Sequence, residues 1–290
     1  MLADLIQNTL DGLAAGAAYA LLAVGFTLIF GVLRRVNLSY GPAIMLGAYC
    51  ATWTYLNFQA GLLVLGIMTV AGTVIAGAYV EKLCFAPHRK GSAIAAMVAS
   101  FAVWMQLEAV AMLALPKHLY PFPPLYLGGP FDFAGFTVRI EALAMLAAAV
   151  VVGALLWGIL YRTRFGIAAR AVIDSPLAAE LAGISVPRVF VGVFALASAI
   201  GGLAGFLISA SVEQVTPMLG MWSTLKGLLA MMLGGLGSLP GAVAGALVLG
   251  LVEAHSQWFL GPQLRDLIVY LLLFVLLAIG PRWMTTRSAS

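Results

Sequence analysis

The stretch GLAAGAAYALLAVGFTLIFGVL, residues 12–33, runs for 22 residues without a charged side chain. A helix needs about 20 predominantly apolar residues to cross the hydrocarbon core of a bilayer, so this stretch predicts a transmembrane helix. Arg34 and Arg35 follow directly, and they would end the span because a charged side chain is costly in the membrane core. The same pattern of long apolar runs between short polar segments continues along the rest of the chain.

The composition points to the same class of protein. Of the 290 residues, 63% are hydrophobic and 9% are charged, whereas about 25% of the residues of a soluble domain are charged. The chain offers eight or nine stretches of span length. They are continuous, and the strands of a β-barrel would instead be short segments of alternating hydrophobicity. The sequence therefore predicts an all-α polytopic membrane protein with about eight or nine transmembrane helices in one domain, 1–290.

Glycine and proline set the boundaries of two spans. The second span, 37–55, contains Gly41–Pro42, which predicts a broken second helix. The run 222–258 is too long for one span, and GGLGSLPG at Gly234–Gly241 divides it, so we expect a hairpin of two spans there. The other expected spans cover residues 61–80, 93–115, 141–161, 189–210 and 264–279.

The distribution of basic residues gives an orientation. Eleven fall on one side of this arrangement, three fall on the other, and Lys226 lies near a span end. Cytoplasmic loops carry an excess of lysine and arginine, so the side with eleven is predicted to be cytoplasmic, with the N-terminus outside and the C-terminus in the cytoplasm. Segment 162–188 is then a cytoplasmic loop and segment 116–140 an extracytoplasmic loop. The eleven are Arg34, Arg35, Lys82, Arg89, Lys90, Arg162, Arg164, Arg170, Arg188, Arg282 and Arg287, and the three are Lys117, Arg139 and Arg265.

Inside the cytoplasmic loop, the stretch SPLAAELAG predicts a short helix with well-defined ends. Ser175 is a preferred N-cap, Pro176 suits the first helical position, and Gly183 suits the left-handed residue that follows a helix. Leu177 and Leu181 are four residues apart, so they share one face. Two turns do not hold alone in water because helix nucleation is costly. We therefore expect this apolar face to rest on another surface.

The chain lacks the motifs of common enzyme classes. A P-loop needs Gly-Lys-Ser/Thr, and none of the four lysines is followed by serine or threonine. The three histidines are scattered, and neither HExxH nor GxSxG occurs. We therefore expect no catalytic residues, no metal and no cofactor. Any dependence on ATP must come from another subunit.

Three charges are expected near or within the spans. Glu108 is either a pathway or structural-pair residue, or the fourth span ends earlier and Glu108 lies near the outer headgroups. Lys226 and Glu253 are either a buried pair across the hairpin or separate side chains that extend to opposite surfaces.

Closely spaced glycines predict close packing between helices. These glycine motifs are Gly12-x-x-x-Gly16, Gly201-Gly202-x-x-Gly205 and Gly241-x-x-x-Gly245.

Three blocks of the sequence together resemble a known family. Residues 12–49, which end in RRVNLSYGPAIMLGAY, resemble the amino-terminal signature of permease subunits of the branched-chain amino-acid (hydrophobic amino-acid uptake) ABC importers. Residues 163–207, which begin TRFGIAARAVIDSPLAAELAGISVPR, are similar to their cytoplasmic coupling loop and the helix after it. Residues 228–253 are similar to their GGLGS-x-x-G segment. The length resembles the shorter of the two permease types that pair in these importers.

The resemblance implies a set of partners and a site. Permeases of this family form a dimer, usually of two different subunits, in the bacterial inner membrane. Two cytoplasmic ATPase subunits attach beneath, an extracytoplasmic binding protein delivers the substrate, and no nucleic acid is involved. The helix at Pro176–Ala182 would be the coupling helix that lies in a cleft of the ATPase. The residues implied to take part in coupling are Arg170, Asp174, Pro176, Leu177, Ala178, Glu180, Leu181, Gly183 and Ile184.

The resemblance leaves the substrate open. Family members commonly carry His or Gln before the glycine at position 41 and an acidic or small residue after it, whereas this chain has Tyr40 and Pro42. Urea, short amides or related amino acids are therefore alternatives to leucine, isoleucine and valine. An ion-coupled secondary transporter acting alone would carry several charges deep in its spans, and a structural membrane scaffold would need no punctuated cytoplasmic helix. The possible pathway residues are Asn37, Tyr40, Gly41, Pro42 and Glu108.

Overall fold

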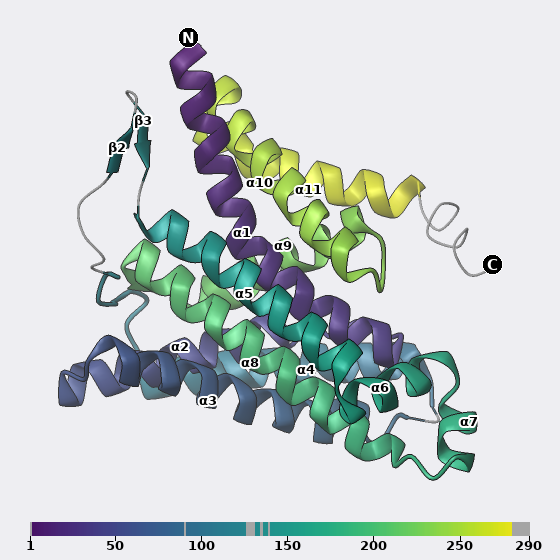
Figure 1. Ribbon diagram of the computed structural model, residues 1–290. Helices are drawn as coiled ribbons and strands as arrows, with labels where there is room; N and C mark the ends of the chain where they lie inside the picture. The colour runs from purple at the N-terminus through teal and green to yellow at the C-terminus, as the bar shows by residue number, and fades with distance from the viewer. Residues whose placement is uncertain (1, 90, 126–130, 134–135, 139, 280–290) are drawn as a thin grey trace. The chain divides into compact units, whose positions relative to one another are not determined.

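The computed structural model describes residues 2–89, 91–125, 131–133, 136–138 and 140–279. Its described residues are almost entirely helical, which confirms the predicted all-α polytopic class (Figure 1). By length and composition, six of the helices found among them could cross a membrane. Four of the basic residues from which we predicted the orientation lie outside the described residues; they are Lys90, Arg139, Arg282 and Arg287. The α-helices are α1 (Leu2–Leu33), α2 (Tyr40–Phe58), α3 (Leu62–Val80), α4 (Ala93–Ala114), α5 (Ile140–Arg162), α6 (Arg164–Asp174), α7 (Pro176–Leu181), α8 (Val186–Val212), α9 (Met218–Gly234), α10 (Leu239–Leu260) and α11 (Pro262–Ile279).

The chain divides into two compact units, and each is described by itself. Unit 1 comprises residues 1–27, 127–149 and 226–290, and unit 2 comprises residues 28–126 and 150–225.

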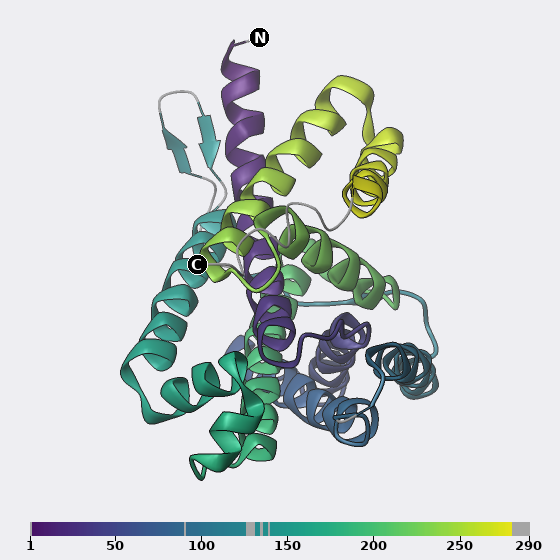
Figure 2. The ribbon, with the colours of Figure 1, turned by 90° about the vertical axis from the view of Figure 1, so that its right-hand side faces the viewer.

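Unit 2 is built on three helices, α2, α3 and α8, that pack closely at small residues. Figures 1 and 2 both show α2 and α3 side by side. Gly47 of α2 faces Thr69 and Thr73 of α3, and Gly202 of α8 faces Val70 and Thr73. A Cβ atom at either glycine would overlap these neighbours, so the close approach of the helices depends on the missing side chains. The predicted packing role of the glycine motif at 201–205 is thereby confirmed.

The second helix is not broken at Gly41–Pro42, and that prediction is wrong. α2 begins at Tyr40, so Gly41 and Pro42 lie in its first turn, and the non-helical segment is 34–39. A proline fits the first turn because the first amide groups of a helix have no partner within the helix. Gly41 faces Gly220 at the start of α9, so the glycine serves a close approach between chain segments.

The loop that we predicted to be cytoplasmic contains two helices where one was expected. α6 was not predicted, although Thr163 caps it by accepting a hydrogen bond from the Gly166 amide at 3.1 Å. α7 confirms the predicted short helix. The Ser175 side chain accepts from the Ala178 amide, Pro176 is the first helical residue, and Gly183 has φ +82°.

Two short antiparallel strand pairs lie in segments that we expected to be irregular. β1 (Tyr120–Pro121) pairs with β4 (Gln214–Val215), which joins the predicted extracytoplasmic loop to the segment after α8. β2 (Phe131–Phe133) and β3 (Phe136–Val138) form a separate hairpin, visible in Figure 2. The β1–β4 pair therefore marks the end of α8 that we predicted to be extracytoplasmic.

The run 222–258 is divided into two helices at the predicted place; α10 is long and apolar enough to cross a membrane, whereas α9 is a shorter apolar helix, so two spans stay a prediction there. α9 ends at Gly234 and α10 begins at Leu239, although α9 starts earlier than expected, at Met218. The turn contains Gly235 and Gly237 at φ +92° and +83°, a conformation that favours glycine. Ser238 caps α10 by accepting from the Gly241 amide at 3.2 Å.

Small residues also bring together the helices of unit 1. Gly12 and Gly16 of α1 face α10 at Gly250 and Ala246, and Gly245 of α10 faces Ala230 of α9 and Gly234. The predicted packing role of the glycines in α1 and α10 is confirmed. A buried apolar cluster formed by α1, α9, α10 and α11 surrounds these contacts; its members are Ala20, Ala23, Leu229, Ala230, Met232, Ala242, Ala246, Leu249, Val269 and Leu276.

Candidate functional site

A pocket of about 740 Å³ lies in unit 2 at the amino-terminal end of α8. Its walls come from three segments that are distant in sequence: the end of α1, the turn after the π-helix η1 (Glu81–Phe85), and the run from α6 through α7 to α8. All three carry basic residues that we predicted to be cytoplasmic. Four of the predicted coupling residues line this pocket together, namely Asp174, Pro176, Leu177 and Glu180.

Arginine side chains hold the walls of this pocket in place. Arg35 donates to the backbone carbonyls of His88, Arg89 and Gly91, which fastens the end of α1 to the turn after η1. Arg89 forms an ion pair with the buried Glu81, and its guanidinium lies 5.4 Å from the centre of the Phe190 ring on α8. The two arginines thus contact backbone carbonyls, a buried carboxylate and an aromatic ring. Such contacts hold the walls of the pocket together, whereas exposed charge pairs contribute little to stability.

α7 presents an uncovered apolar face beside this pocket. Leu177 and Leu181 are 68% and 83% exposed, whereas Ala179 on the opposite side of the helix is buried. The end of α7 is closed by the amide of Ile184, which donates to the Ala179 carbonyl at 2.9 Å, and by Gly183. The helix is therefore well ordered at both ends, yet its two leucines have no cover in the described chain. Such an apolar patch is typical of an interaction surface.

The other predicted coupling residues surround this face. Arg170 lies on α6 with its guanidinium 4.8 Å from the centre of the Tyr161 ring, an arrangement typical of a cation–π contact. Ala178 and Glu180 are exposed on α7. The structure therefore brings the predicted set together on α6, α7 and the turn that follows.

The predicted pathway residues of the second span lie in the packed core of unit 2. Asn37 is buried, and its side-chain oxygen accepts from the Ser39 amide at 3.0 Å. Tyr40 is buried as well, and its hydroxyl donates to the Ala197 carbonyl of α8 at 2.9 Å. Gly41 and Pro42 follow in the first turn of α2, also buried. In this structure these residues fasten α2 to its neighbours.

Glu108 lies within the helical part of the fourth span. α4 continues as a helix past Glu108 to Ala114, which is compatible with both predicted alternatives for this residue. The Glu108 carboxylate accepts from the indole nitrogen of Trp104, one turn earlier, at 3.1 Å. Among the residues that the structure describes, no three His, Cys, Asp or Glu side chains gather as a metal site would require.

A buried charge network lies in unit 1. The Nζ atom of Lys226 donates to Oε1 of Glu253 at 2.8 Å and to the Tyr19 hydroxyl at 2.7 Å. The Nε atom of Arg265 lies 3.0 Å from the same Oε1. The pair across the hairpin, one of two predicted alternatives, is thereby confirmed. Sequence reasoning missed Arg265 and Tyr19; the one available signal was that Arg265 was expected on the extracytoplasmic side, where the second span of the predicted hairpin, which contains Glu253, would end.

Several known proteins are similar to this chain over most of its length. Residues 8–277 match the family described as branched-chain amino acid transport system / permease component. The chain is 28% identical over 289 residues to the high-affinity branched-chain amino acid transport system permease protein LivH of Escherichia coli (strain K12), covering 95% of this chain and 94% of that protein. It is 26% identical over 289 residues, with the same coverage, to the permease protein BraD of Pseudomonas aeruginosa.

A solved structure shares the fold. PsaBC from Streptococcus pneumoniae in complex with Fab superimposes with a TM-score of 0.56 at 11% identity, covering 98% of this chain and 98% of that chain. At this identity the likeness concerns the fold alone. The family match is the stronger finding, since it covers residues 8–277 and so includes α6, α7, the pocket beside them and the charge network. The chain therefore belongs to the family of branched-chain amino acid transport system permease components.

Proposed function

We propose that this chain forms part of the translocation path of an ATP-driven importer for branched-chain amino acids. It would work beside a second, related permease, with two ATPase subunits beneath it and a binding protein outside. The observation that carries the proposal is α7, a short helix with two exposed leucines next to a pocket whose lining segments are predicted to be cytoplasmic. The relatives LivH and BraD, which are named for branched-chain amino acid transport, support the choice of substrate.

The chemistry of the importer is divided between chains. As a member of this permease family, the chain is a transport subunit and not an enzyme, and ATP hydrolysis belongs to a separate ATPase. The permease therefore has to receive a mechanical signal from another protein. A stable helix with an apolar face is suited to that task, because it can transmit a displacement only if it keeps its shape.

We propose that Leu177 and Leu181 dock in a cleft of the ATPase. Burial of a leucine side chain contributes about 1.5–3 kcal/mol, so two such residues supply a substantial part of a subunit contact. Arg170, Asp174 and Glu180 would lie at the polar rim and set the register of docking, since rim charges act mainly on specificity and encounter rate. Pro176, Ala178, Gly183 and Ile184 would maintain the helix and its exit.

The path from α7 into the membrane would run through α6 and α8. Phe165 of α6 packs directly against Gly192 of α8, close enough that a Cβ atom at that glycine would overlap the ring. A displacement of α7 and α6 would therefore move α8. Transport requires only two arrangements of the bundle, whose populations ATP and the binding protein shift in different directions.

We keep Asn37, Tyr40, Gly41, Pro42 and Glu108 as candidate residues of the translocation path. The burial of Tyr40 means that a path along the start of α2 opens only when α2 and α8 separate, which breaks the hydrogen bond to Ala197. Such a bond, present in one state and absent in the other, is what alternating access needs.

We infer an orientation in the bacterial inner membrane with the N-terminus outside and the C-terminus in the cytoplasm. Two observations support it. Segments with predicted cytoplasmic basic residues share the pocket at the start of α8, whereas two segments predicted to be extracytoplasmic pair as β1 and β4 at its other end. α8 has 27 residues, and at 1.5 Å per residue a helix of that size is about 40 Å long, enough to span a bilayer.

Uptake by the reconstituted importer tests the proposal. The chain, with the subunits that co-purify with it, is placed in proteoliposomes with ATP on the ATPase side, and uptake of labelled leucine is measured with and without excess urea, acetamide or fructose. We expect ATP-dependent leucine uptake that valine and isoleucine inhibit and the other solutes do not. Leucine uptake driven by an ion gradient, without ATP and without an ATPase, would contradict the proposal. Inhibition by urea or acetamide would assign the importer to small amides.

A further inference from the structure

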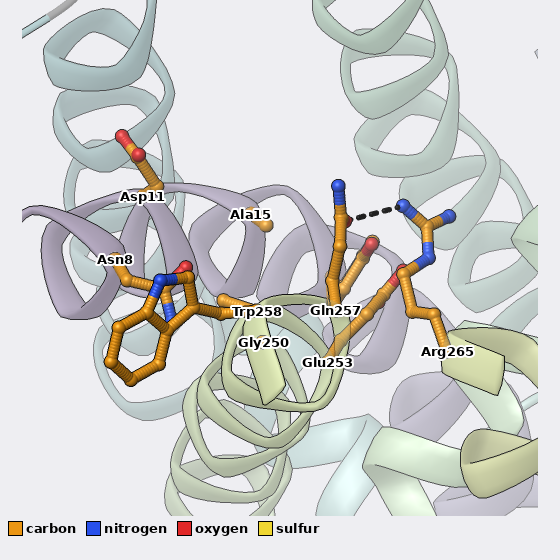
Figure 3. A pocket seen from close by; sticks show the side chains of 10 residues that line it. Asn8, Asp11, Ala15, Gly250, Glu253, Gln257, Trp258 and Arg265 are labelled. Atoms are coloured by element: carbon orange, nitrogen blue, oxygen red, sulfur yellow. Dashed lines mark hydrogen bonds and ion pairs between the residues drawn. The ribbon is translucent and has the colours of Figure 1, made fainter. Parts of the chain in front are cut away.

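A second pocket, of about 440 Å³, lies in unit 1 between the first half of α1 and the corner formed by α10 and α11 (Figure 3). Its volume falls in the range of about 300–1,000 Å³ that is typical of small-molecule sites. Asn8 lies beside the Trp258 ring on one side, and Glu253 lies next to Gln257 and Arg265 on the other (Figure 3). The pocket is therefore lined by polar groups on both sides of an apolar ring.

Two buried polar atoms of this pocket have no partner in the described chain. Glu253 is 4% exposed, and while its Oε1 receives Lys226 and Arg265, its Oε2 accepts no hydrogen bond. The amide nitrogen of Asn8 is buried and donates none. Burying an unsatisfied polar group costs free energy. An unused acceptor and an unused donor in the same pocket indicate a ligand that satisfies both.

The charges of the pocket select the kind of ligand. Asp11 and Glu253 contribute carboxylates, and Arg265 contributes a guanidinium whose Nη1 donates to Gln257 at 3.2 Å. The two carboxylates would repel a simple anion, and Arg265 together with the neighbouring Lys226 would repel a simple cation. A small molecule that carries an ammonium and a carboxylate together avoids both repulsions, because a guanidinium has further N–H donors to offer.

We propose that this pocket binds a small zwitterionic α-amino acid. The ammonium group of the ligand donates to Oε2 of Glu253, its carboxylate accepts from the Asn8 amide and from Arg265, and its apolar side chain lies against the Trp258 ring. The inference rests on the proposed function, since it places a binding site for the amino-acid cargo on the extracytoplasmic side of the same subunit. Glu253 then has two tasks: Oε1 holds the helices together, and Oε2 receives the ligand.

Calorimetric titration of leucine tests this site. The full-length chain with its co-purifying subunits is placed in nanodiscs without the binding protein. Leucine is compared with 3-methylbutylamine, which lacks the carboxylate, and with 4-methylpentanoate, which lacks the ammonium group. We expect saturable binding of leucine and a loss of about tenfold or more in affinity for each truncated compound, as the loss of a charge-assisted hydrogen bond predicts.

Two variants and one control locate the binding. Asn8→Ala is expected to weaken leucine binding about tenfold with little effect on folding, because Asn8 lies outside the Lys226–Glu253–Arg265 network. Thr9→Ala, the next residue on α1 and not part of the pocket lining, is expected to bind leucine like the wild type. Glu253→Gln should weaken binding further; if it does not fold, Asn8→Ala decides.

Two results would overturn the proposed binding site: leucine does not bind at all, or it binds the Asn8→Ala variant as tightly as the wild type. The same preparations are assayed for ATP-driven leucine uptake. Normal uptake together with unchanged binding in Asn8→Ala rejects the site and leaves the proposed function standing. Absence of leucine uptake by the wild type rejects the proposed function, and the titration still decides whether the pocket binds an amino acid.

Discussion

The Nζ atom of Lys226 lies 2.8 Å from Oε1 of Glu253, and this ion pair joins α9 to α10 where both side chains are shielded from solvent. Removing two charges from water is costly, and their attraction offsets the cost only when the geometry is good and other groups complete the hydrogen bonding. Tyr19 and Arg265 supply that completion here. The pair therefore ties α1 and α11 to the hairpin as well.

The network predicts an order of stability among single variants. Glu253→Gln leaves the Lys226 ammonium buried without its carboxylate, and breaking a buried pair in this way costs about 3–5 kcal/mol. Arg265→Gln should cost less, because the Arg265 side chain is 32% exposed and its loss leaves the main pair intact. Thermal unfolding of the purified chain followed by fluorescence-detected size exclusion measures both. If the Glu253→Gln and Arg265→Gln variants melt at the same temperature, the Lys226–Glu253 pair does not stabilise unit 1 in the way described here.

A pair of glycine variants tests the packing of unit 2. A Cβ atom at Gly47 would overlap Thr73 and the backbone of Thr69 on α3, whereas one at Gly153 of α5 meets no atom within 4 Å. Gly47→Ala is therefore expected to lose about 1–3 kcal/mol, the usual cost of overpacking. Gly153→Ala serves as the matched control and should be neutral or slightly stabilising, because alanine favours helices over glycine. Melting temperatures that fall equally in both would contradict the packing described for α2 and α3.

Local signals in the sequence predicted the features that depend on a few neighbouring residues. α7 follows from Ser175, Pro176 and Gly183, each of which has its conformational preference without help from distant contacts. The turn at Gly234–Gly241 between α9 and α10 follows from glycine, serine and proline for the same reason. Of the eight or nine expected spans, six correspond to described helices that are long and apolar enough to cross a membrane, and these were predictable because hydrophobicity is summed over many residues.

Features that depend on tertiary contacts could not be predicted in the same way. The pairing of Tyr120 with Val215 joins segments far apart in sequence, and neither segment contains a local sequence signal that predicts it. Gly41–Pro42 has the composition of a break, yet it lies in the first turn of a continuous helix because Gly41 accommodates Gly220 from another segment. The third member of the charge network, Arg265, was missed since an arginine at a span end is ordinary by itself.

The N-cap of α7 makes a prediction about transport. Ser175 accepts a hydrogen bond from the Ala178 amide, and the loss of such a cap costs about 1 kcal/mol of helix stability. Ser175→Ala should therefore reduce ATP-driven uptake a few-fold without lowering the amount of folded protein, and Ser175→Thr should retain uptake. Undiminished uptake by Ser175→Ala would mean that the order of α7 does not limit coupling.

The orientation can be tested by cysteine labelling. In a Cys50→Ala/Cys84→Ala background, Asn57→Cys is placed in the last turn of α2 and Ala182→Cys directly after α7, both at exposed positions. The excess of basic residues on one side predicts that position 57 faces outside and position 182 faces the cytoplasm. A membrane-impermeant maleimide should label intact cells at position 57 and should label position 182 only after permeabilisation. The reverse pattern would invert the proposed topology.

The most direct test of the central claim is ATP-driven leucine uptake, together with recovery of the ATPase, in the Leu177→Glu/Leu181→Glu double variant. Both side chains are exposed in this structure, so the change should leave the permease folded while placing charges in the proposed apolar contact with the ATPase. The matched control, Leu177→Met/Leu181→Met, keeps the face apolar. We predict that the glutamate variant loses the ATPase on purification and loses uptake, and that the methionine variant keeps both. Normal uptake and normal ATPase recovery in the glutamate variant would contradict coupling through α7.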